Sequence, residues 1–77
     1  MDINPLALAA MRQLAGHSQA SLSRLSGVSQ GHISDLESGT KKNASPATIK
    51  KLAEALGVPI GALASVRVSP KIAAEVA

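Results

Sequence analysis

Apolar residues recur every three or four positions along most of the chain, which is the spacing of amphipathic α-helices. Asn4-Pro5 and Ser45-Pro46 each combine a helix-capping side chain with a proline suited to the first helical position. Glycines close several of the runs, as they commonly do after the last turn of a helix. The pattern predicts helices over about 5–15, 19–26, 30–38 and 46–56, followed by a short fifth helix that Pro59 opens.

Residues 18–38 form the most informative stretch, because two short helical runs there meet at Gly27. A residue without Cβ is favoured at such a corner, where the chain tends to need a positive φ. Ser18 is expected to cap the first of these helices and Ser29 the second, and Val28 is expected to fill the space between them. Five apolar residues are expected to face inward: Leu22, Leu25, Val28, Ile33 and Leu36. This spacing is typical of a helix-turn-helix, whose second helix can enter the major groove of DNA.

The helix over 30–38 sorts into two faces when its residues are placed about 100° apart. Ile33 and Leu36 share the inner face. Gln30 lies at the flank, and the outer face holds small and polar residues: Gly31, Ser34, Asp35 and Ser38. Glycine costs a helix about 0.5–1 kcal/mol relative to alanine. Gly31 therefore reflects either weak selection in the first turn or clearance for a phosphate or base edge.

The remaining helices carry their own apolar positions, and the pattern weakens after residue 65. Apolar residues recur at helical spacing in the first helix, at Leu6, Leu8, Met11 and Leu14, and in the fourth, at Ile49, Leu52, Ala53 and Leu56. The fifth helix is expected to pack back on the others through Ile60 and Leu63. We therefore assign 1–64 to one domain and 65–77 to a C-terminal tail. The tail forms either a short sixth helix or an irregular segment, and its valines and Ile72 must pack on the domain, on a second subunit or on a protein partner.

The composition narrows the class of protein. A chain of 77 residues fits one domain, and the absence of cysteine excludes disulfides and thiolate metal sites. No Phe, Tyr or Trp is present, which argues against single-strand binding and RNA-recognition sheets, since both stack bases on aromatic rings. No membrane-spanning run or signal peptide is evident, so a cytoplasmic location is expected.

The chain carries a net charge of +3, and its lysines are unevenly distributed. Four of them fall within eleven residues just after the second helix of the motif: Lys41, Lys42, Lys50 and Lys51. A basic cluster beside a groove-reading helix is the electrostatic pattern of a nucleic-acid binder. Lysines placed only to keep a surface soluble would give the same pattern, so this feature does not decide alone.

Catalysis is disfavoured by the available side chains. His17 and His32 are the only histidines, and His32 and Asp35 stand three residues apart on one helix, whereas triad members are held in a walled pocket. His32, Asp35 and Glu37 do not match a known metal-ligand spacing either. We expect no enzymatic activity, no metal and no cofactor.

From Met11 to Leu63 the sequence resembles the small phage-repressor-like helix-turn-helix domains of the Cro and C1 type, the XRE family. The resemblance rests on an ordered set of short motifs: Ser18-Gln19, Leu22, Gly27-Val28-Ser29-Gln30, His32-Ile33-Ser34, Glu37-Ser38-Gly39, and Ile49 through Leu56-Gly57-Val58. It implies an all-α fold, a compact five-helix bundle of the lambda-repressor-like type, whose third helix lies in the major groove.

The resemblance also implies roles for individual residues. The positions that match base-reading residues are Gln30, Gly31, Ser34 and Asp35. The positions that match phosphate-contacting residues are Gln19, Ser29, His32, Thr40, Lys41, Lys42 and Asn43. Arg12 and Glu37 match a pair that often bridges the first and third helices in this family. Gly31 leaves one reading position without a side chain, and Asp35 would place a negative charge near phosphates unless it accepts from a cytosine amino group.

Two functions follow as hypotheses. The first is a sequence-specific regulator of transcription, expected to act as a repressor and as a homodimer on an inverted repeat in double-stranded DNA. The second is an antitoxin-like or adaptor module that uses the same fold to bind a protein, through residues 65–77.

Overall fold

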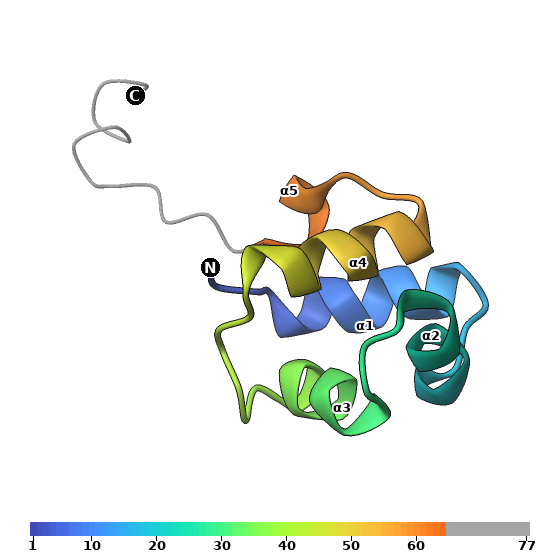
Figure 1. Ribbon diagram of the computed structural model, residues 1–77, viewed down its shortest axis with the longest axis horizontal. Helices are drawn as coiled ribbons and strands as arrows, with labels where there is room; N and C mark the ends of the chain where they lie inside the picture. Colours follow the sequence, from blue (N-terminus) through green and yellow to red (C-terminus); the bar gives the residue numbers. More distant parts are fainter. Residues whose placement is uncertain (65–77) are drawn as a thin grey trace.

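The computed structural model describes residues 1–64, and all regular secondary structure in that range is helical. The five helices are α1 (Pro5–Leu14), α2 (Gln19–Ser26), α3 (Gln30–Ser38), α4 (Pro46–Leu56) and α5 (Ile60–Leu63) (Figure 1). The expected all-α bundle of five helices is confirmed, with α1 ending one residue early. Within 1–64 no helix has the length and hydropathy to cross a membrane. The expectations for the tail, 65–77, lie outside the described residues.

Side-chain caps start the first four helices as the sequence predicts. The Asn4 Oδ1 atom accepts from the backbone N–H groups of Leu6 and Ala7, at 3.1 and 3.2 Å. Three serines each accept from the N–H three residues further on: Ser18 at 3.0 Å, Ser29 at 3.2 Å and Ser45 at 3.2 Å. Each cap satisfies an N–H group that has no partner inside its helix, which stabilises the helix by about 1 kcal/mol.

The helices enclose one aliphatic core. In Figure 1, α1 crosses the middle of the bundle, with α3 on one side and α4 and α5 on the other. α1 packs on α3 and α5, and α2 packs on α3 and α4. The largest fully buried side chains are Leu8, Leu22, Ile33, Leu36, Ile49, Leu52 and Leu63. Full burial of each contributes about 1.5–3 kcal/mol, so the aliphatic core is the main source of stability.

Two residues expected to pack inward, Leu25 and Ile60, are exposed instead, and so are two leucines of α1. Leu6 and Leu14 are each 81% exposed, Leu25 is 58% exposed, and Ile60 is 40% exposed. The sequence of α1 is apolar on most of its circumference, so helical spacing alone could not select the buried side. The contacts with α3 and α5 select it, and they turn Leu8 inward.

The error at Leu25 has a similar cause. α2 is held between α3 and α4, and these contacts bury the face centred on Leu22. Its flanking residues on that face are half-buried serines, Ser23 and Ser26. Leu25 lies on the other flank of Leu22, about 60° away around the helix, and therefore meets solvent.

Residues 1–4 run between two distant parts of the chain. The Ile3 N–H donates to the Lys42 carbonyl at 3.0 Å, and the Ala44 N–H donates to the Met1 carbonyl at 3.0 Å. Isolated antiparallel bridges join Asp2 to Asn43 and Ile3 to Ala64. The N-terminal segment therefore braces both the loop before α4 and the end of α5, with the Ile3 side chain buried.

Candidate functional site

The turn between α2 and α3 has the geometry that its sequence predicts. Gly27 ends α2 with φ +78°, and its N–H donates to the Ser23 carbonyl at 2.9 Å. The Val28 N–H donates to the Ser26 hydroxyl at 3.1 Å, and the Val28 side chain is buried. A residue with a Cβ would be strained at this φ, so Gly27 fixes how α3 leaves α2.

The outer face of α3 presents polar groups that the fold does not use. Gln30 and Ser34 are exposed and Asp35 is half-buried, while Ile33 and Leu36 on the opposite face are fully buried. Within residues 1–64, no hydrogen bond or ion pair involves the Asp35 carboxylate. This face therefore offers an amide, a hydroxyl and a carboxylate to a molecule outside the chain.

Gly31 lies among these residues, in the first turn of α3. Its φ is not positive, and a Cβ built on it would meet nothing within 4 Å. Alanine at this position would be compatible with the backbone and with the packing, and would favour the helix by about 0.5–1 kcal/mol. The fold of residues 1–64 therefore does not require glycine here.

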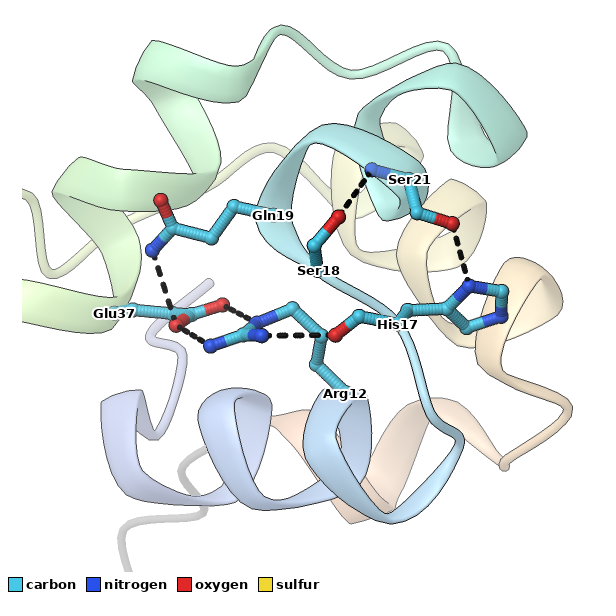
Figure 2. A network of polar contacts seen from close by, with 6 residues as sticks. All are labelled: Arg12, His17, Ser18, Gln19, Ser21 and Glu37. Carbon is cyan, nitrogen blue, oxygen red and sulfur yellow. Dashed lines mark hydrogen bonds and ion pairs between the residues drawn. The ribbon is translucent and has the colours of Figure 1, made fainter.

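An ion pair anchors α3 to α1. The Arg12 Nε and Nη2 atoms lie 2.7 and 2.9 Å from the two carboxylate oxygens of Glu37 (Figure 2). The side chains are only 13% and 8% exposed. The hydrogen bond from Glu37 raises the pKa of Arg12 above its usual value, although burial acts in the opposite direction. The third guanidinium nitrogen, Nη1, donates to the His17 carbonyl at 2.9 Å and so ties the link between α1 and α2 to the same pair.

Gln19 joins this network from the first turn of α2. Its Nε2 atom donates to the Glu37 Oε1 atom at 3.2 Å (Figure 2). A side-chain amide carries two N–H groups, so the second can donate to another acceptor such as a phosphate oxygen. Three helices thus meet at one carboxylate. The contact between Gln19 and Glu37 was not anticipated, and no local signal indicates it because the two residues are 18 positions apart.

A second polar contact that sequence reasoning missed lies nearby. The His17 Nδ1 atom is 2.8 Å from the Ser21 hydroxyl (Figure 2). No acidic side chain of residues 1–64 is bonded to this pair, which therefore lacks the third member of a catalytic triad. Nor do three or more metal-ligating side chains gather anywhere in the described range. The contact serves to hold the start of α2 against the preceding link.

The loop after α3 holds the candidate phosphate-contacting residues Thr40, Lys41, Lys42 and Asn43, all of them exposed. The Lys41 N–H donates to the Asp35 carbonyl at 3.1 Å, and the Thr40 hydroxyl lies 2.8 Å from that of Ser38. Neither Lys41 nor Lys42 has an ion-pair partner within residues 1–64. The loop thus combines a defined backbone with two positive charges that the fold leaves unneutralised.

The other two lysines of the predicted cluster lie elsewhere. Lys50 and Lys51 are exposed on α4, which packs against α2 and α5. The Lys50 ammonium is 4.0 Å from the Glu54 carboxylate one turn further on. Only the lysines at 41 and 42 follow α3 directly.

Ser29 and His32 complete the set at the start of α3. The Ser29 hydroxyl accepts from the His32 N–H at 3.2 Å and keeps its own hydrogen free to be donated. Ser29 is exposed and His32 is half-buried. The candidate residues therefore come from three places: the start of α2, the first turn and outer face of α3, and the loop that follows α3.

Comparison with known proteins places this arrangement in context. The profile of the helix-turn-helix family matches residues 8–63. Among solved structures, the restriction-modification controller protein C.AhdI from Aeromonas hydrophila superimposes with a TM-score of 0.71 and 33% sequence identity. The match covers 75% of this chain and 86% of that one. A comparison with curated proteins gave no significant match.

Proposed function

The chain belongs to the helix-turn-helix family of the phage-repressor-like (XRE) type, and we propose that it is a transcription regulator that reads the major groove of double-stranded DNA with α3. One observation carries the proposal. The side chains of Gln30, Ser34 and Asp35 on the outer face of α3 make no hydrogen bond or ion pair within residues 1–64, and this face lies between two sets of phosphate-binding candidates. Such a face has the chemistry for base edges, and its surroundings have the chemistry for the DNA backbone.

The side chains on α3 suit particular bases. The Gln30 amide can donate to and accept from one adenine at the same time, and the Asp35 carboxylate can accept from the amino group of cytosine. Ser34 can pair with several bases, because a hydroxyl both donates and accepts. We therefore propose that Gln30, Ser34 and Asp35 supply the direct discrimination between sequences.

The phosphate contacts are proposed to flank this reading face. Gln19, Ser29 and His32 stand in the first turns of α2 and α3, where free N–H groups and the helix dipole favour an anion. Lys41 and Lys42 would neutralise phosphates further along the groove. Thr40 and Asn43, in the same loop, would contact the sugar-phosphate backbone of the DNA. These contacts would supply most of the affinity and little of the specificity.

A homodimer that represses transcription by occupying its operator is the form that we propose. Two copies would read an inverted repeat whose half-sites are centred about one helical turn, roughly 34 Å, apart. Regulation of this kind places the protein with the DNA of a bacterium or of a phage-infected cell. C.AhdI, a restriction-modification controller protein, is a structural relative of this chain.

Selection from a random duplex library, at a stated salt concentration, tests the proposal. We expect an inverted repeat to be enriched, with two half-sites about 10 base pairs apart, and an equal pool of single-stranded DNA to give no consensus. A consensus without symmetry would contradict the proposed homodimer but still support base reading by α3. If no duplex is enriched, DNA recognition by α3 is wrong.

The alternative of an antitoxin-like or adaptor module depended on residues 65–77, which lie outside the described residues. One observation in the described range favours a protein contact, namely the exposure of Leu6, Leu14 and Leu25. Failure of the duplex selection, together with a stable complex between this chain and a protein, would make that alternative the better account.

A further inference from the structure

Gly31 is the residue of the α3 surface that the fold explains least. Of the five other glycines within residues 1–64, four have φ between +69° and +82°, and this conformation accounts for them; the fifth, Gly61, lies in the four-residue helix α5, away from α3. Gly31 is helical, has no such φ, and would carry a Cβ without meeting any atom within 4 Å. Its presence lowers the stability of the helix without relieving any contact within residues 1–64. The missing side chain therefore leaves clearance on the outer face of α3 that no group of residues 1–64 fills.

The position of Gly31 on α3 indicates which group of the DNA would use this clearance. On α3 it precedes Ser34 and Asp35 by three and four residues, so the three share one face, and Gln30 is its immediate neighbour. Gln30 has the chemistry that recognises adenine, whose paired base is thymine. The 5-methyl group of thymine stands out from the edge of the base pair into the major groove and is the apolar group displayed there.

We propose that Gly31 is a specificity-determining residue that admits a thymine methyl group against the bare backbone of α3. The inference rests on the proposed function and adds to it a base, an atom and a mode of recognition. A side chain at this position would occupy the volume of the methyl group and hold α3 away from the groove. Gly31 thus selects a base through the space it leaves rather than through a hydrogen bond.

The test combines a protein change with a DNA change. Gly31→Ala adds one methyl group to the protein, and replacing thymine by deoxyuridine at a single operator position removes one from the DNA. Dissociation constants are measured for the four combinations, at each thymine of the selected operator in turn. We expect Gly31→Ala to weaken binding to the thymine operator about tenfold or more, the usual effect of one overpacked methyl group. At one position in each half-site, deoxyuridine should restore the affinity of Gly31→Ala to within about threefold of the wild-type protein on the same DNA.

A matched control separates binding from helix stability. Ala47 is exposed and is the second residue of α4, as Gly31 is the second residue of α3. Ala47→Gly should lower the midpoint of thermal unfolding and leave the dissociation constant unchanged. Gly31→Ala should raise the midpoint while it weakens binding. Opposite changes in stability and affinity would show that the glycine serves recognition.

Each other outcome overturns the inference in a distinguishable way. Equal binding by Gly31→Ala and wild type would remove Gly31 from specificity while leaving the proposed function intact. A loss of affinity that no deoxyuridine relieves would mean that Gly31 faces the sugar-phosphate backbone and that the methyl group is wrong. If the wild-type protein selects no duplex at all, the proposed function fails and the role of Gly31 fails with it.

Discussion

Substitution of Gln30 should reduce DNA binding at one base position rather than for all sequences alike. Its exposed amide stands at the start of α3 with no bond to the rest of residues 1–64. Gln30→Ala should cost about 1–3 kcal/mol of binding free energy at one base position, because the proposed bidentate contact with a base would be lost there. Competition binding with single-base operator variants measures this. The mutant should no longer distinguish the base at that position, and a uniform loss across all variants would contradict the assignment.

Substitution of Lys41 should instead weaken binding to all DNA sequences. Lys41→Ala removes a positive charge that no acidic group within residues 1–64 neutralises. Binding to every duplex should weaken alike, and the slope of log K against log salt should become less steep by about one unit. Titrations at four or five salt concentrations give that slope. Lys51→Ala, on α4, is the matched control and should leave it unchanged.

Between helices, the ion pair of Arg12 and Glu37 should contribute far more stability than its exposed counterpart on α4. Glu37→Gln leaves a largely buried guanidinium without its counter-charge and should lower the free energy of unfolding by about 2–4 kcal/mol, a little under the cost for a fully buried pair. Glu54→Gln, at an exposed pair, should change it by less than about 0.5 kcal/mol. Urea unfolding of both variants gives the comparison, and similar losses would contradict it.

The exposed side of α1 offers a second comparison within one helix. Leu8→Ala empties a fully buried site and should lower the free energy of unfolding by about 2–5 kcal/mol. Leu6→Ala and Leu14→Ala should change it by less than about 0.5 kcal/mol, because both side chains already meet water. Large losses at Leu6 or Leu14 in a monomeric sample would mean that the buried side of α1 is different.

The limits of helices were predictable here because they depend on local chemistry. Asn4, Ser18, Ser29 and Ser45 each cap the helix that the sequence assigned to them, and each bond spans no more than three residues. The buried side of a helix depends on which neighbours it meets. For α3 only one side is apolar, so its orientation could be predicted. For α1 several sides are apolar, and helical spacing did not show that Leu6 and Leu14 would be exposed.

Across the whole molecule, the contacts that position the candidate site join residues far apart in the chain. Glu37 meets Arg12 across 25 positions and Gln19 across 18, and no periodicity links them. The pairing of Arg12 with Glu37 entered through the family resemblance, whereas the place of Gln19 beside them required coordinates. The roles of the base-reading and phosphate-contacting residues remain predictions that binding measurements must test.

The backbone pairing of residues 1–3 affects the basic loop that precedes α4. Their backbone is paired with the strand-like stretch that carries Lys42 and Asn43, through the hydrogen bonds at Ile3 and Ala44. Deletion of residues 1–3 would release that basic loop, although no proposed DNA contact is removed. We expect such a shortened protein to bind its operator more weakly and to lose amide-exchange protection at Ala44, measured by hydrogen exchange. Residues 1–3 therefore hold in place a DNA-binding loop to which they contribute no proposed DNA contact of their own.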